Sequence, residues 1–201
     1  MMYLSGKAVD DPRIGVMLSF NVGKQRLHGH DHFAADNGCY ARPDKYTDAG
    51  FLRWLDRLDR RGCLFATAPD VVGDAAATRV RARPMLPKIR ELGFKAAYVG
   101  QDGARPNDIP WSEIDALFIG GTTDWKLSQA AGDLIGEAKQ RGKHVHMGRV
   151  NSFLRLRVAH VLGCHSADGN YLSFEPARQQ NVVDWLDRLS RQGTFEYKFA
   201  C

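Results

Sequence analysis

The chain has 201 residues, 44% of them hydrophobic, so it can bury a core and is most simply one domain over residues 1–201. Lysine and arginine total 28 against 23 acidic residues, and the net charge of +5 suits a polyanionic partner such as nucleic acid without requiring one. These values argue against a disordered chain. The sequence contains no uninterrupted run of about 18 apolar residues, so no membrane-spanning helix is predicted. A cytoplasmic protein without membrane contact is therefore expected.

Short apolar runs alternate with longer amphipathic runs along the chain. The apolar runs predict strands at residues 14–19, 33–35, 63–66, 96–99, 116–119, 144–147 and 161–166, with a possible further strand at residues 3–5. The amphipathic runs predict helices at residues 47–61, 74–92 and 124–141, begun by Thr47, Asp74 and Asp124 as N-caps. Pro84 and Pro87 are expected to kink or split the second helix.

This alternation favours a parallel sheet built from repeated strand–helix units. Seven or eight strands in 201 residues predict a compact or incomplete TIM (β/α)8-like barrel, since such barrels rarely use fewer than about 200 residues. A doubly wound open sheet is the alternative, but no G-x-G-x-x-G phosphate loop follows the first strand.

Polar residues stand where the predicted strands end. In a barrel the loops after the strands share one face, so Asp36, Asp70, Gln101 and Asp168 would surround one opening, together with Gly120, Gly121 and Arg149. Carboxylates grouped in this way permit nucleophilic attack by one and proton transfer by another. The alternative for any single position is an ordinary turn, because aspartate before glycine is common in turns.

Cysteines and histidines give no metal pattern. Cys39, Cys63, Cys164 and Cys201 lack the close pairing of a zinc ribbon, and they are expected to be reduced thiols. The histidine-rich segment 28–32 is interpreted as a polar loop near the site. His144 and His146 alternate on a strand and therefore share one face, where packing or pocket lining is favoured over metal ligation. Neither a metal nor another cofactor is predicted.

Six of these segments, in order, resemble motifs of the guanine transglycosylase family. They are Ala-Asp-Asn-Gly-Cys-Tyr at 35–40, Ala-Pro-Asp at 68–70, Val-Gly-Gln-Asp-Gly at 99–103, Ile-Gly-Gly-Thr at 119–122, His-Met-Gly-Arg-Val at 146–150 and Gly-Cys-His-Ser-Ala-Asp at 163–168. The cysteine cluster that binds zinc in the tRNA-modifying members is missing, which points to the compact, phage-type DNA-guanine transglycosylases.

The resemblance implies an activity and a role for each residue. Guanine in DNA would be replaced by a 7-deazaguanine of the preQ0 type through a covalent glycosyl-aspartate, with Asp168 as nucleophile and Asp36 as general base. Asp70, Gln101, Gly120 and Gly121 would hold the base, and the forked guanidinium groups of Arg149 and Arg155 would contact phosphates. The expected partners are DNA, the deazaguanine base and further proteins that give access to DNA.

Three alternatives remain open. The first is the same exchange on tRNA, and the second is a non-catalytic nucleic-acid-binding subunit of such an enzyme. The third is a barrel hydrolase of free nucleosides, which would not need the surplus of basic residues.

Overall fold

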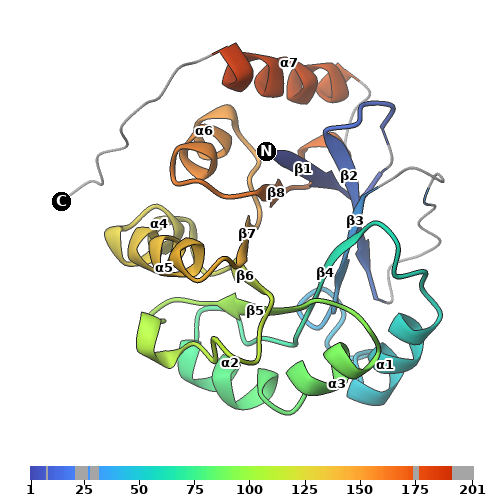
Figure 1. The fold of residues 1–201 in the computed structure, drawn as a ribbon. Helices are drawn as coiled ribbons and strands as arrows, with labels where there is room; N and C mark the ends of the chain where they lie inside the picture. Colours follow the sequence, from blue (N-terminus) through green and yellow to red (C-terminus); the bar gives the residue numbers. More distant parts are fainter. Residues whose placement is uncertain (8, 21–26, 28–31, 174–176, 192–201) are drawn as a thin grey trace.

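The computed structural model describes residues 1–7, 9–20, 27, 32–173 and 177–191, and its eight parallel strands close into a barrel in sequence order. The ring closes where β1 pairs with β8 (Figure 1). The strands are β1 (Met2–Ser5), β2 (Ile14–Ser19), β3 (Phe33–Asp36), β4 (Cys63–Thr67), β5 (Ala96–Gly100), β6 (Ala116–Ile119), β7 (His144–Met147) and β8 (Ser166–Asp168). The predicted barrel is confirmed, and it is complete, because the possible strand at residues 3–5 is β1.

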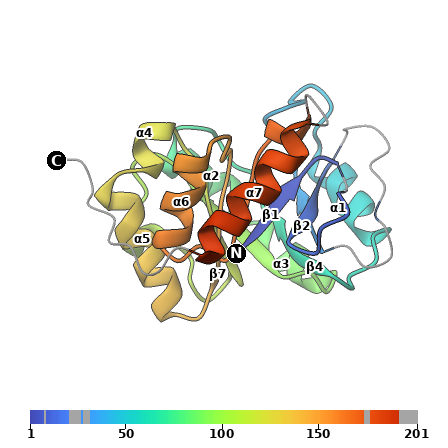
Figure 2. The same cartoon turned by 90° about the horizontal axis from the view of Figure 1, so that it is seen from above.

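Helices lie around the barrel (Figure 1), and they connect β3 to β4, β4 to β5, β6 to β7 and β7 to β8, while α7 follows β8. They are α1 (Asp48–Asp56), α2 (Ala75–Ala82), α3 (Leu86–Glu91), α4 (Thr123–Lys126), α5 (Gln129–Gln140), α6 (Phe153–Val161) and α7 (Ala177–Arg191), with 3-10 turns η1 (Pro106–Asp108) and η2 (Tyr171–Ser173). Seen from above, α7 lies across the side of the barrel formed by β1 and α6 (Figure 2). Within the described residues, no helix is both long and apolar enough to cross a membrane.

The predicted helix starts are partly confirmed. The Thr47 hydroxyl caps α1 by accepting from the Gly50 N–H at 3.1 Å, and the Asp74 carboxylate caps α2 by accepting from the Ala77 N–H. The expected helix at residues 74–92 is divided into α2 and α3 before Pro87, as the prolines predicted. Asp124 is not an N-cap, however, because residues 124–141 form two helices that Thr122 and Ser128 cap.

The last third of the chain differs most from the sequence-based elements. The strand expected at residues 161–166 is wrong, since Val161 ends α6 and only Ser166 begins β8. Gly163 has a φ of 83°, a left-handed conformation that ends the helix and that glycine adopts without strain. The chain therefore needs residues 162–165 to turn back into the barrel.

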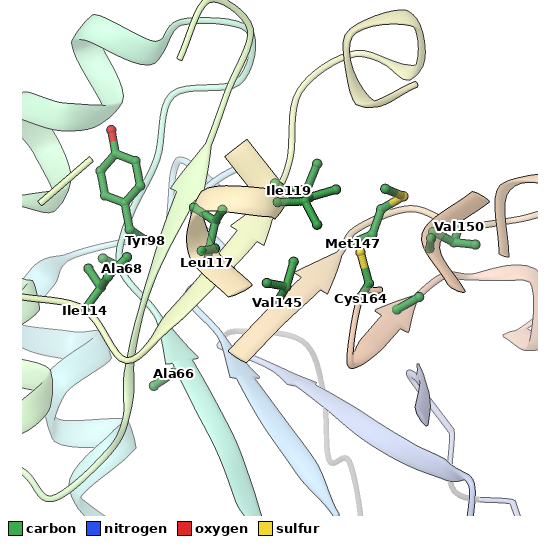
Figure 3. Close-up of a cluster of buried hydrophobic side chains, with 14 of the residues drawn as sticks. Ala66, Ala68, Tyr98, Ile114, Leu117, Ile119, Val145, Met147, Val150 and Cys164 are labelled. Atoms are coloured by element: carbon green, nitrogen blue, oxygen red, sulfur yellow. The ribbon is translucent and has the colours of Figure 1, made fainter. Parts of the chain in front are cut away.

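The hydrophobic core has two layers. The outer layer fills the space between strands and helices, and includes Leu117 and Ile119 of β6 with Val145 and Met147 of β7 (Figure 3). The inner layer lies inside the barrel and contains Leu4, Ala34, Phe65, Ala97 and Ala116. Each large apolar side chain buried in these layers stabilises the fold by about 1.5–3 kcal/mol. Residues 144 and 146 alternate with Val145 and Met147, so their side chains face the barrel interior.

Candidate active site

Polar side chains collect at the carboxyl ends of the strands, where a cavity of about 230 Å³ opens. Successive strands or the loops that follow them contribute Ser19, Asp36, Asp70, Gln101, Gly120, Arg149 and Asp168. Strand ends in a closed parallel barrel converge, which brings together residues far apart in sequence. Of the eight residues predicted for the site, six therefore line one cavity, whereas Gly121 and Arg155 do not.

Asp36 ends β3, and its carboxylate is held by groups that donate hydrogen bonds to it. Its carboxylate receives the Ser19 hydroxyl at 2.6 Å and the Gly38 N–H at 3.2 Å. Burial nevertheless raises the pKa of Asp36 from 3.8 to about 6, and the negative charges of Asp70 and Asp168 add to that rise. Such a carboxyl can change its protonation near neutral pH, as a general acid or base must.

Asp70 and Gln101 form a fixed pair. The Gln101 Nε2 donates to Asp70 at 2.6 Å, and its Oε1 accepts from the N–H groups of Gly73 at 3.0 Å and Gly121 at 2.8 Å. Burial raises the pKa of Asp70 above its usual value. Gln101 thus orients the carboxylate of Asp70. The second hydrogen on Nε2 of Gln101 remains available to a ligand.

The two glycines after β6 have their N–H groups bonded within the fold. The Gly120 N–H donates to the Gly100 carbonyl at 2.9 Å, and the Gly121 N–H donates to Gln101. A side chain at Gly120 would come within 2.8 Å of Gln101 Nε2. Gly120 therefore keeps the wall of the cavity open beside Gln101. Contact between Gly120 and a ligand remains a prediction.

Asp168 ends β8 opposite these groups. Its Oδ1 lies 2.9 Å from Nε2 of the fully buried His146, and its backbone carbonyl accepts from the Val150 N–H at 2.6 Å. While Asp168 is a carboxylate it can only accept hydrogen bonds, so in that state Nε2 of His146 carries the hydrogen. His146 thereby fixes the orientation of Asp168.

Positive charge stands on the β7 side of the mouth. Arg149 has a backbone φ of 56°, which is rare for a residue other than glycine. Its guanidinium donates to the Gly121 carbonyl at 2.5 Å. Behind it, the buried Lys126 donates to the Gly148 carbonyl at 2.7 Å, and burial lowers the pKa of Lys126 to about 8. Arg155 lies on α6 and contributes to the same positive field.

Sequence reasoning missed several residues of this site. Ser19 and Lys126 carry no motif, because a serine at a strand end and a lysine in an amphipathic helix are ordinary surface residues until the barrel closes. His146 was predicted to pack or line the pocket, and its alternation with His144 was the available signal. Residues 28–31 of the histidine-rich segment lie outside the described residues.

No metal centre is formed by the part of the chain that the structure describes, where no three histidine, cysteine or acidic side chains are grouped as ligands. Cys39, Cys63 and Cys164 are free thiols. The negative charges of Asp70 and Asp168 act on Asp36 across the cavity.

No protein-family model and no curated protein matches this sequence. The fold is similar to that of tryptophan synthase from M. tuberculosis, with a TM-score of 0.52 and 17% identity over 80% of this chain and 61% of that chain. Tryptophan synthase from Pyrococcus furiosus gives 0.52 and 14%, over 81% and 67% of the two chains. For 3-hexulose-6-phosphate synthase from Salmonella typhimurium the values are 0.48 and 15%, over 80% and 75%. This chain spans less than two thirds of the M. tuberculosis chain, and identities this low carry the barrel fold alone.

The resemblance to guanine transglycosylases is wrong. The tryptophan synthase structures that the fold is similar to are enzymes of another kind, and no family model matches to support the six motifs. Those motifs are three to six residues long, and a parallel barrel itself places Asp, Gly and Gln at strand ends in sequence order. We therefore withdraw the expected guanine exchange in DNA, the same exchange on tRNA and the related role as a nucleic-acid-binding subunit. The expected role of Asp168 as the nucleophile of glycosyl transfer is withdrawn with them.

The predicted partners are a separate matter. None of these similarities tests contact with DNA, tRNA, a deazaguanine base or further proteins. Contact with nucleic acid stays a prediction from charge, and the base and the further proteins were expected from the resemblance alone. The site residues likewise stand on their geometry in the cavity and on nothing that the similar structures carry.

Proposed function

We propose that this protein is an enzyme of proton transfer, which isomerises a small polar anion or eliminates a group from it. Asp36 is the base that removes a proton from the substrate, and Asp168 returns a proton at a second atom. Asp70 accepts hydrogen bonds from hydroxyl or amino groups of the substrate, and Arg149 binds its anionic substituent.

The observation that carries this proposal is the pair of unlike carboxyl groups across one cavity. Asp36 has a pKa raised to about 6 by burial, whereas Asp168 is hydrogen-bonded to a buried imidazole. Titratable groups whose surroundings differ in this way are typical of paired acid and base residues. At pH 7 Asp36 is mostly ionised and is a stronger base than an ordinary aspartate, as proton abstraction requires.

Arg149 supplies the reason for an anionic substrate. Its backbone is held in the left-handed region, which costs about 1–2 kcal/mol for a side chain with a Cβ. That conformation places the guanidinium at the cavity, and its bond to Gly121 leaves further N–H groups of the fork for a carboxylate or phosphate. Strain held at a cavity wall is characteristic of functional positions.

Solvent exchange tests the proposal across many small anions at once. The protein is incubated in D2O with pools of small carboxylates and phosphate esters, and mass spectrometry detects molecules that gain deuterium at carbon. We expect a subset of anionic molecules to exchange, at a rate that falls by about 100-fold or more in Asp36→Asn.

The matched control is Asp184→Asn, which changes a surface carboxylate on α7 that bonds Gln180 and leaves the cavity untouched. It should exchange at the wild-type rate. Absence of exchange for every pool, or equal rates in Asp36→Asn and the wild type, would contradict the proposed function.

A further inference from the structure

A row of hydrogen-bonded side chains runs through the inside of the barrel, away from the cavity. Asp168 Oδ1 lies 2.9 Å from His146 Nε2, His146 Nδ1 lies 2.8 Å from the Ser166 hydroxyl, and that hydroxyl lies 2.8 Å from His144 Nε2. Strands β7 and β8 are neighbours in register, with His146 opposite Ser166, so alternate residues of both strands point inward together.

The row has a defined beginning and end. Asp168 faces the cavity at the carboxyl end of β8, while His144 is the first residue of β7 and lies partly exposed at the amino end of the barrel. There the ring of His165, which is exposed, stacks on His144 with centroids 5.0 Å apart. The row therefore connects the cavity with the opposite end of the barrel.

Aromatic rings separate the row from other polar groups. Phe65 packs against both histidines, at centroid distances of 5.6 Å to His144 and 5.1 Å to His146, and Phe118 lies 4.5 Å from His146. His146 and Ser166 are fully buried. An apolar wall of this kind strengthens hydrogen bonds within the row.

Hydrogen counting gives the row a direction. In the state in which Asp168 is a carboxylate it only accepts, so His146 donates from Nε2, and in the neutral ring Nδ1 is then an acceptor. The Ser166 hydroxyl has one hydrogen, which it gives to His146, and it accepts from His144 Nε2. Burial lowers the pKa of His144 to about 3, which agrees with a neutral donor ring at that place.

We propose that Asp168, His146, Ser166 and His144 form a proton relay, through which Asp168 exchanges its proton with solvent at the amino end of the barrel. The use of that proton in catalysis rests on the proposed function, but the relay itself does not. In this arrangement His146, Ser166 and His144 are positioning residues that act through Asp168.

The transfer balances for one proton. A solvent proton binds His144 Nδ1, the Nε2–H bond of His144 breaks toward the Ser166 oxygen, and the Ser166 hydrogen passes to His146 Nδ1. The Nε2–H bond of His146 then breaks toward Asp168 Oδ1. Asp168 ends neutral and both rings end as the Nδ1–H form, and the reverse sequence releases the proton at the amino end.

This row is not a hydrolytic serine triad, although it contains serine, histidine and aspartate. The Ser166 oxygen is fully buried between two imidazoles, and it does not line the cavity. A substrate carbonyl has no approach to it, so nucleophilic attack by Ser166 is excluded on geometry.

Charges around both ends bear on the proton affinity of the row. The charges of Lys126 and Asp36 lie near Asp168, and His165 and Lys95 act on His144. These groups are the same in the variants proposed below, so a change in coupling is attributable to the row.

Nitrogen NMR of protein labelled with 15N-histidine tests the relay directly. At pH 7 we expect both His144 and His146 to carry hydrogen on Nε2. As the pH is lowered and Asp168 or His146 gains a proton, His144 should change to the Nδ1–H form with the same midpoint. A His144 ring that keeps its Nε2–H form through that transition would overturn the relay.

Two variants interrupt the row, and one matches them as a control. Ser166→Ala removes the connecting hydroxyl and should abolish the coupled change, and persistence of coupling in Ser166→Ala would refute the proposal. His144→Gln keeps a side-chain donor that cannot pass a proton between two nitrogens, and because it removes the ring that reports the coupling, it is tested through kcat. Ser5→Ala removes another fully buried barrel serine that bonds the Lys7 N–H, and it should preserve the coupling.

Activity provides an independent outcome. With a substrate found by deuterium exchange, His144→Gln should lower kcat by about tenfold and leave KM unchanged, less than the ~100-fold loss typical of a direct acid or base. An unchanged kcat overturns the use of the relay in catalysis while leaving the proposed function intact. Coupled histidines in a protein that exchanges no substrate would reject the proposed function and retain the relay.

Discussion

Replacement of Asp36 by asparagine should stabilise the protein in a pH-dependent manner. The pKa of this carboxyl rises from 3.8 to about 6 on folding because burial disfavours its charge. At 1.36 kcal/mol per pKa unit, that change amounts to about 3 kcal/mol. A raised folded pKa gives stability that is complete below pH 3.8 and lost as the pH rises through about 6.

Asparagine is neutral at every pH and so avoids this loss. Its oxygen can keep the bonds from the Ser19 hydroxyl and the Gly38 N–H, and its NH2 group can face the Thr67 hydroxyl, now 3.4 Å from Asp36 Oδ1. The difference in unfolding free energy between Asp36→Asn and the wild type should therefore increase by up to about 3 kcal/mol between pH 4 and pH 7.

Urea unfolding at a series of pH values measures this difference. Asp11→Asn is a control of opposite sign, because hydrogen bonds from Arg13 lower the pKa of Asp11. That variant should be less stable than the wild type at pH 7, and its deficit should shrink as the pH falls through the folded pKa of Asp11. A difference for Asp36→Asn that is constant from pH 4 to pH 7 would refute the raised pKa and remove the basis for Asp36 as the base.

Three further predictions concern the loops around the site. Arg149→Gly should raise the unfolding free energy by about 1 kcal/mol by relieving the left-handed strain, while substrate affinity falls at least tenfold; loss of stability would contradict the strain. Gly169→Ala should destabilise the protein by about 2 kcal/mol or more, because the new Cβ would overlap the Tyr3 hydroxyl. Gly136→Ala should stabilise it by about 1 kcal/mol, because Gly136 lies in α5 with open space around it. Thermal melts that rank the two variants in the opposite order would contradict both expectations. Lys126→Met should cost about 1–3 kcal/mol in urea unfolding by leaving a buried carbonyl unpaired, and a neutral effect would show that this bond is dispensable.

Much of the barrel could be predicted from the sequence because each strand–helix unit carries local signals. Apolar runs marked the first seven strands well, and Thr47 and Asp74 marked helix starts by their capping chemistry. Closure of the ring could not be predicted in the same way, because β1 is a four-residue strand whose partners β2 and β8 come from opposite ends of the chain.

Helix α6 was missed for a physical reason. From Leu154 to Val158 apolar residues alternate with arginine, a period-two pattern typical of strands, and Leu154 stays exposed in the helix. The pair Leu162–Gly163 repeats the Leu92–Gly93 helix end and was the available signal for a boundary there.

The site itself was found in part. Aspartates at strand ends indicated a shared mouth, and the structure brings Asp36, Asp70 and Asp168 to it. Their chemistry could not be read from short motifs, because pKa values depend on burial and on neighbours such as His146 that only the closed barrel supplies. For this reason the family resemblance predicted the wrong reaction.

Titration of the aspartate carboxyl carbons by 13C NMR tests the pairing of base and acid most directly. We expect Asp36 to titrate with a midpoint near 6, and Asp168→Asn to lower this midpoint by removing one of the negative charges that raise it. A midpoint of Asp36 near 3.8, unchanged in Asp168→Asn, would contradict the pairing of these carboxyl groups as base and acid.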